Sequence, residues 1–166
     1  MPTLIRLEGR AFREAEDLWT SVPDGEHQPA GEAPILISAA RLEGCDHFGD
    51  RPLGVLLTVD DPVEALAPQL NRLSLVALDF PKFRDGRALT AARLLRERYR
   101  FTGEVRAVGD VLRDQAFHMV RCGFDAFIPA DGSDAQTWAR SALRHRHIYS
   151  VSSDARTPAY AEPERA

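Results

Sequence analysis

The sequence predicts an α/β protein whose mostly parallel sheet is built from consecutive strand–helix units. Short apolar runs rich in β-branched residues recur at 54–59, 75–80, 104–110 and 125–130. Each run is followed by a segment with apolar residues at helical spacing, which is typical of a helix that covers a buried strand. The connections are short, and this alternation favours parallel strands joined by right-handed crossovers.

The N-terminal part of the chain is less regular. Residues 3–7 (TLIRL) and the following GRAF, with Gly9 at a turn position, predict a short β-hairpin. Trp19 and Val22 indicate a strand or an anchoring turn, and the Pro- and Gly-rich residues 23–34 are expected to form a loop. The apolar run 34–38 predicts one more strand.

Polar residues mark where the predicted helices begin and end. Asp60-Asp61-Pro62 is typical of a helix start, because a carboxylate caps free N–H groups and proline fits the first turn. Gly123 is expected to end the helix after 104–110. The turn 131–134 should cap a last helix that carries Trp138 and Leu143 on its apolar face.

The length of 166 residues fits one domain. We expect residues 1–33 to form the hairpin and loop, 34–149 the repeating core, and 150–166 an extended or disordered tail. A complete eight-unit barrel needs about 250 residues, so the chain is too short for one. An open flavodoxin-like sheet and a partial barrel both fit, and a homo-oligomer in which a second copy completes the barrel stays open.

Composition excludes several classes of protein. With 44% hydrophobic and 28% charged residues the chain is typical of a globular protein, and its net charge of -4 argues against nucleic-acid binding. No run approaches the roughly 20 apolar residues of a membrane span, and the N-terminus lacks a signal-peptide pattern, so we expect a cytoplasmic protein without membrane contact. Cys45 and Cys122 lie far apart and outside any metal-binding pattern, which predicts free thiols and no metal.

In parallel sheets, ligands bind beyond the carboxyl ends of the strands. Asp79 and Asp110 fall at that edge, where they are either structural or suited to acid–base work. Arg106 lies within a strand that should be buried, so it needs an acidic partner, and Asp79 and Asp114 are the candidates. Asp79, Asp110 and Arg106 are therefore the catalytic candidates, with no reaction assigned to them.

The loop PKFRDGR places Lys82, Arg84 and Arg87 around Asp85, just before a helix. Backbone N–H groups at a helix start and arginine forks suit a phosphate, sulfate or carboxylate. The alternative is a plain turn with solvated cations. The predicted ligand-binding residues are Lys82, Asp85, Arg87, Arg113, Asp114 and Gln115.

Known cofactor and catalytic motifs do not occur. The chain has no G-x-G-x-x-G after its first strand, no phosphate-binding P-loop, no G-x-S-x-G and no H-E-x-x-H. The sequence therefore leaves the cofactor unknown.

Four motifs carry a resemblance to a known family: DFPKFRDGR at 79–87, ARLLRERY at 92–99, TGEVRAVGDVLRDQ at 102–115 and RCGFDAF at 121–127. They resemble a bacterial family of uncharacterised conserved proteins that are encoded beside assimilatory sulfite reductase and are described as oxidoreductases of sulfite reduction. The resemblance implies an accessory role in sulfite assimilation, with sulfite reductase as a partner. It covers residues 53–128 closely, whereas the C-terminal YSVSSDA departs from the family pattern.

Three hypotheses follow. The first is an accessory protein that acts with sulfite reductase and binds an oxyanion at the Lys82/Arg87 loop. The second is a small-molecule enzyme with an acid–base and anion site at the carboxyl edge of the sheet. The third is a structural scaffold without a ligand, in which these polar residues only hold loops together.

Overall fold

The computed structural model describes residues 3–27, 29–42, 49–154 and 156–162. Cys45, predicted to be a free thiol, lies outside the described residues. Cys122 is a free thiol and is half-buried. Within the described ranges no helix is long and apolar enough to cross a membrane.

The predicted N-terminal hairpin is present. Strands β1 (Leu4–Glu8) and β2 (Ala11–Ala15) pair antiparallel, and Gly9 in the turn has a φ of 65°. Glycine takes this left-handed conformation without the strain that a side chain would cause.

The other strands are β3 (Thr20–Ser21), β4 (Ile35–Ser38), β5 (Leu53–Leu57), β6 (Leu73–Phe80), β7 (Glu104–Gly109) and β8 (Ala126–Phe127). They form one curled, eight-stranded sheet in the order β2-β1-β8-β7-β6-β5-β4-β3. Strands β3 to β8 pair parallel, and β1 joins β8 antiparallel. The predicted mixed α/β fold with a mostly parallel sheet is confirmed.

The parallel strands lie beside one another in chain order. A flavodoxin-like sheet reverses its order at a switch point, and the order here shows no such reversal. Each strand–helix unit is therefore added to the same side of the preceding one.

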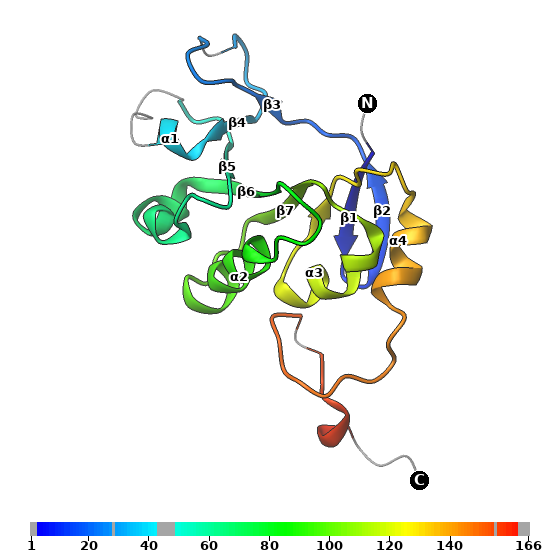
Figure 1. The fold of residues 1–166 in the computed structure, drawn as a ribbon. Helices are drawn as coiled ribbons and strands as arrows, with labels where there is room; N and C mark the ends of the chain where they lie inside the picture. The colour runs from blue at the N-terminus through cyan, green and yellow to red at the C-terminus, as the bar shows by residue number, and fades with distance from the viewer. Residues whose placement is uncertain (1–2, 28, 43–48, 155, 163–166) are drawn as a thin grey trace.

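The helical segments are α1 (Ala39–Leu42), the 3₁₀ helix η1 (Val63–Arg72), α2 (Arg87–Arg93) with its π-helical continuation η2 (Leu94–Arg98), the 3₁₀ turn η3 (Arg113–Gln115), α3 (Ala116–Cys122), α4 (Ala135–Ala142) and the 3₁₀ turn η4 (Ala159–Ala161). Figure 1 shows α2 and α3 on the same side of the sheet, with α4 next to the hairpin.

The main core lies between the sheet and these helices. Val76 and Val105 of the sheet and Met119 of α3 are fully buried in one cluster. Trp138 of α4 belongs to the same cluster, and its ring centroid lies 4.6 Å from that of Phe127. The helices therefore share one apolar face of the sheet.

Two of the predicted caps are present and one is not. Gly123 ends α3 with a φ of 97°, and Asp134 accepts a hydrogen bond from the Thr137 amide at 2.7 Å at the start of α4. The segment after Asp60 is a 3₁₀ helix that contains Pro68, and its first position has no side-chain cap. Proline removes one backbone donor from the helix interior, which works against a regular α-helix there.

The opposite face of the sheet has its own buried residues, Leu4, Leu75, Ala77 and Ala126. Residues 16–19, which we call the strap, join β2 to β3 and cross the sheet in Figure 1. A Cβ built on Gly54 would lie only 2.8 Å from the Trp19 ring, so Trp19 packs directly on this face. The strap thus covers part of the face that the helices leave open.

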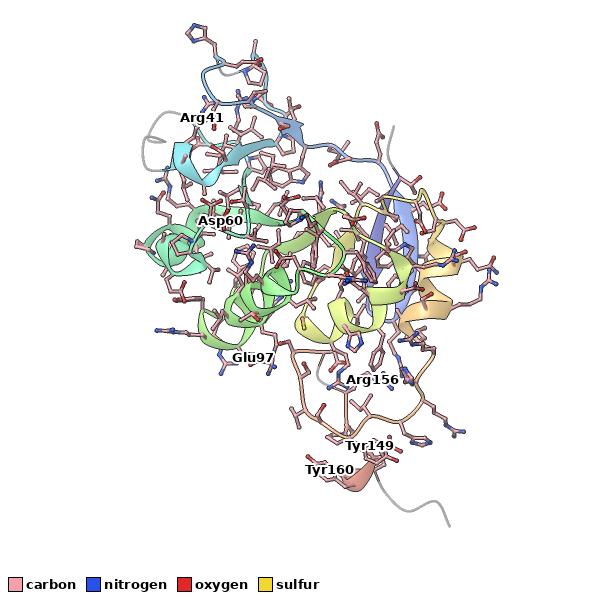
Figure 2. The ribbon with its side chains drawn as sticks, in the orientation of Figure 1. Arg41, Asp60, Glu97, Tyr149, Arg156 and Tyr160 are labelled. Atoms are coloured by element: carbon pink, nitrogen blue, oxygen red, sulfur yellow. The ribbon has the colours of Figure 1, made fainter. Side chains whose placement is uncertain are left out.

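The C-terminal segment, described over 143–154 and 156–162 and expected to be extended or disordered from residue 150, folds back on itself and on α3. The Ala159 amide donates to the Ile148 carbonyl at 2.6 Å, and the Ser153 amide donates to the Arg121 carbonyl at 3.1 Å. In Figure 2, Tyr149 and Tyr160 lie together at its outer end.

Candidate functional site at the carboxyl edge of the sheet

The turns that follow β6 and β7 lie side by side. The Asp110 amide donates to the Phe80 carbonyl at 2.7 Å, and the Phe83 amide donates to Asp110 Oδ2 at 2.7 Å. The side-chain amide of Gln115 donates to the Phe83 carbonyl. Asp110 and Gln115 therefore hold the 81–86 loop in place.

Gly109 allows the two turns to approach this closely. It has a φ of 89°, and a Cβ there would lie 2.5 Å from both Asp79 Oδ1 and the Phe80 carbonyl oxygen. Such distances exclude a side chain, so glycine is required where β7 ends.

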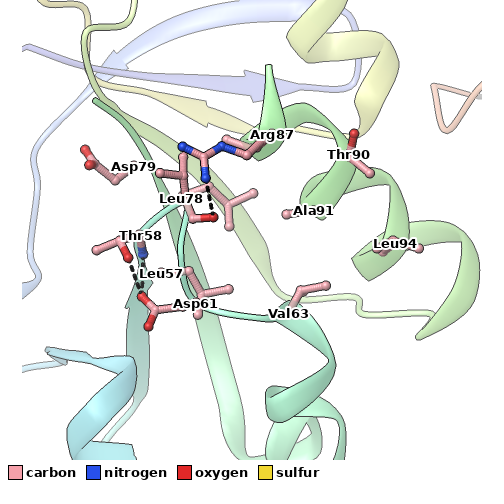
Figure 3. A pocket seen from close by; sticks show the side chains of 12 residues that line it. Leu57, Thr58, Asp61, Val63, Leu78, Asp79, Arg87, Thr90, Ala91 and Leu94 are labelled. Atoms are coloured by element: carbon pink, nitrogen blue, oxygen red, sulfur yellow. Dashed lines mark hydrogen bonds between the residues drawn. The ribbon is translucent and has the colours of Figure 1, made fainter. Parts of the chain in front are cut away.

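Asp79 is the carboxyl group with the most unusual surroundings at this edge. Partial burial raises its pKa above the ordinary value. Within the described ranges it forms no hydrogen bond or ion pair, and in Figure 3 its carboxylate points away from the Arg87 guanidinium. A carboxyl group with a raised pKa and no partner is suited to exchange a proton.

Arg87 is already occupied by acidic partners. Its Nη2 lies 2.8 Å from Asp85 Oδ2, and its Nη1 lies 3.0 Å from Asp60 Oδ1. Hydrogen bonds to Arg87 lower the pKa of Asp85, and both carboxylates raise that of Arg87. An oxyanion at Arg87 would have to displace these carboxylates.

Lys82 and Arg84 differ from Arg87. Both are exposed, and neither forms a hydrogen bond or ion pair in the described part of the chain. Arg113 and Asp114 are exposed as well. Hydrogen bonds from Ser133 lower the pKa of Asp131, and the Arg113 charge adds to this effect. Lys82 and Arg84 are therefore the cations of the 81–86 loop that have no acidic partner among the described residues.

A pocket of about 250 Å³ opens between η1 and α2. Its polar lining residues are Thr58, Asp61, Asp79, Arg87 and Thr90, and Leu57, Val63, Leu78 and Leu94 are among its apolar ones (Figure 3). Of the predicted site residues only Asp79 and Arg87 line it.

Asp61 and Thr58 were not singled out as site residues from the sequence. Asp61 Oδ2 accepts from the Thr58 amide and hydroxyl, both at 2.7 Å. The sequence places Asp61 in a helix cap, and only the fold shows that it turns back to the end of β5 and borders the pocket.

Arg106 does not pair with Asp79 or Asp114, so this expectation was wrong. Its side chain is 1% exposed, with Nε 2.8 Å from Glu104 Oε1 and Nη1 2.9 Å from Asp17 Oδ1. Arg106 therefore lies beneath the strap, on the face opposite the helices, and away from the edge loops.

The strand register explains why a buried arginine fits there. Ala77 and Ala126 are the register neighbours of Arg106 on β6 and β8, and their small side chains leave room for the guanidinium. Glu104 also pairs with Arg6 Nη2 at 3.0 Å. The alternation of Glu104 and Arg106 along one strand was a signal for this cluster, but its third member, Asp17, lies 89 residues from Arg106.

The fold and this edge define a class: mixed α/β proteins with a curled, mostly parallel sheet whose polar loops meet at its carboxyl end. More particularly, the chain belongs to a family of bacterial proteins of unknown function, DUF934, whose model matches residues 54–160. This match agrees with the bacterial family of uncharacterised proteins that the motifs indicated. It includes β5 from its second residue on, strands β6 to β8 and both edge loops. No curated protein matches the chain.

Proposed function

We propose that this protein is a cytoplasmic accessory protein of sulfate and sulfite assimilation that binds sulfite reductase through its carboxyl-edge loops. The motifs shared with the family encoded beside sulfite reductase support the choice of partner. The observation that carries the proposal is the exposure of Lys82 and Arg84, which have no acidic partner among the described residues.

The loop that carries these cations is held in position before a partner arrives. Asp110 and Gln115 bind the backbone of Phe83, next to both cations. A fixed loop loses less conformational freedom on binding than a free one. In a chain of net charge -4, an unpaired cationic loop is a suitable contact for an acidic protein surface or a small oxyanion such as sulfite.

The unreversed strand order and the curl of the sheet support the partial-barrel form of the fold. In such a sheet all the loops at the carboxyl ends of the strands converge on one edge. The cationic loop then lies where related folds bind their ligands.

Binding to the partner is tested by affinity purification of tagged protein from its native host. We expect sulfite reductase to be retained by the wild type and to be lost or reduced about tenfold with Lys82→Ala/Arg84→Ala. The control is Arg98→Ala, since Arg98 is also exposed but stacks on Tyr99 beyond the far end of α2. Equal retention by the edge variant, or no retention by the wild type, would count against the proposal.

Deletion of the gene tests the pathway. The deletion strain should grow on sulfide but fail on sulfate and sulfite, and the wild-type gene should restore growth. Growth on sulfite without the gene would exclude a role at the reductase step.

A second candidate function is a small-molecule enzyme at the same edge. It is favoured by the raised pKa of Asp79 in the pocket that Arg87 and Thr58 also line. A titration with sulfite, followed by NMR, should then shift the amide resonances of Thr58 and Thr90. Asp79→Asn should abolish turnover without abolishing these shifts. Under the accessory proposal the shifts would instead centre on residues 82–84.

A further inference from the structure

A second and larger cavity lies at the other end of the sheet, near the amino ends of β7 and β8. Its volume is about 790 Å³, and Leu7, Gly123 and Asp125 border it. The Leu7 amide donates to the Asp125 carbonyl at 2.7 Å, which places the end of β1 at the start of β8. The cavity is therefore separate from the carboxyl edge.

The cavity has an apolar lining under a roof of charged side chains. Leu7 and Phe12, which face each other across the hairpin, line it together with Val120, Phe124 and Leu143. The C-terminal segment contributes Arg146, His147, Ser153, Asp154, Arg156, Thr157 and Glu162. In Figure 2, Arg156 lies on the side of this segment that faces the helices.

Several of the charged groups have partners within the protein. Arg96 pairs with Asp125 and donates to the carbonyls of Phe101, Gly103 and Gly123. His147 Nδ1 lies 3.2 Å from Glu162 Oε2. Arg156 donates to the carbonyls of His145 and Arg146. These contacts build the walls of the cavity.

Three polar groups of the lining have no side-chain partner among the described residues. Arg10, in the hairpin turn, and Arg146, in the C-terminal segment, form no side-chain hydrogen bond or ion pair in the part of the chain that the structure describes. Oδ2 of Asp154 is buried and has no hydrogen-bond partner there. Two free cations above an apolar floor are complementary to a ligand that is both anionic and apolar, and Oδ2 of Asp154 would accept from an N–H or O–H group of that ligand.

We propose that this cavity binds a small amphipathic anion: an aromatic or aliphatic body against Phe12, Phe124 and Leu143, and an acidic head group at Arg10 and Arg146. Ligand pockets of about 300–1,000 Å³ are typical for molecules of this size. An inorganic oxyanion would leave the apolar lining uncovered, so the site differs in its ligand class from the carboxyl-edge loops.

The test uses the full chain and the fluorescent probe 8-anilinonaphthalene-1-sulfonate, with its uncharged relative N-phenyl-1-naphthylamine. We expect saturable binding of the sulfonate at one site. Arg10→Ala/Arg146→Ala should weaken the sulfonate about tenfold or more and leave the uncharged relative nearly unchanged, because only the charge-assisted contacts are lost. Leu143→Glu should weaken both probes. Competition by 1-naphthoate and 1-naphthyl phosphate distinguishes a carboxylate from a phosphate head group.

The control is Arg140→Ala, since Arg140 is an exposed arginine of α4 that does not line the cavity. Circular dichroism and the urea midpoint check that each variant is folded. Absence of saturable sulfonate binding to the wild type overturns the proposal. Equal affinity of the Arg10/Arg146 variant, or an equal loss with Arg140→Ala, also overturns it. None of these results bears on Lys82 and Arg84, so the proposed partner interaction is tested separately.

Discussion

Removal of Asp17 should release the strap from the sheet. Asp17 accepts from Arg106 at 2.9 Å, and Arg106 is 1% exposed, so Asp17→Ala leaves a buried guanidinium group without one of its acceptors. A charge-assisted hydrogen bond of this kind contributes about 1.5–3 kcal/mol. The Asp17 side chain is 31% exposed, which favours the lower end of that range. Its weaker bond to the Trp19 amide at 3.2 Å adds roughly 0.5 kcal/mol.

We therefore expect Asp17→Ala to lower the free energy of unfolding by about 2 kcal/mol, measured by urea denaturation at neutral pH. Asp17→Asn keeps an oxygen acceptor and should cost about half as much. Glu16→Ala is the matched control, because Glu16 is an exposed neighbour with no hydrogen bond or ion pair to any described residue. It should change stability by less than about 0.5 kcal/mol.

A double-mutant cycle with Arg106→Met isolates the interaction. The coupling energy between positions 17 and 106 should be about 1–2 kcal/mol, because the two residues are in direct contact. The Trp19 fluorescence should shift to the red in Asp17→Ala as the strap loosens. A cost for Asp17→Ala no larger than that of Glu16→Ala, with no coupling to Arg106, would refute this account of the strap.

Three further predictions concern the sheet and its edge. Gly54→Ala should lower the free energy of unfolding by about 1–3 kcal/mol because the new Cβ meets the Trp19 ring. Gly86→Ala, with open space around it, should change that free energy by less than about 0.5 kcal/mol. Equal urea midpoints for the two variants would contradict the packing of Trp19 on Gly54. Asp110→Ala should lower the free energy of unfolding by about 1–2 kcal/mol and speed hydrogen exchange at the Phe83 amide, and Asp110→Asn should have an intermediate effect. Unchanged exchange would show that the bond between Asp110 and the Phe83 amide does not hold the loop. Burial raises the pKa of Asp79 in the folded state, so the stability linked to this group is present at low pH and is lost as pH rises through the raised value. Asp79→Asn should therefore gain stability relative to wild type between about pH 3 and pH 7, and a constant difference in urea midpoint would argue against the raised pKa.

Local patterns predicted the elements better than their pairing. The hairpin, the parallel strands and the caps at Gly123 and Asp134 follow from turn residues and hydrophobic periodicity, which act over a few residues. The position of β1 beside β8 depends on contacts between the two ends of the chain, and no local pattern encodes it.

The same limit applies to the site. Adjacent parallel strands bring their carboxyl ends together, so the proximity of the two edge turns could be predicted from strand order alone. Side-chain direction could not. Arg87 has the same charge as Lys82 in the sequence, and only the fold shows that two carboxylates neutralise it. The large cavity was missed because the hairpin, α3 and the C-terminal segment each supply only part of its wall.

The pairing of β1 with β8 also has a consequence for biosynthesis. Leu4–Glu8 is synthesised before its neighbour Ala126–Phe127, which is made more than a hundred residues later. Until then the edge of β1 that later pairs with β8 is unpaired, and such an edge is a surface that chaperones and other nascent chains recognise. The rate of productive folding should therefore be set by this late closure, and slowing translation would not by itself accelerate it.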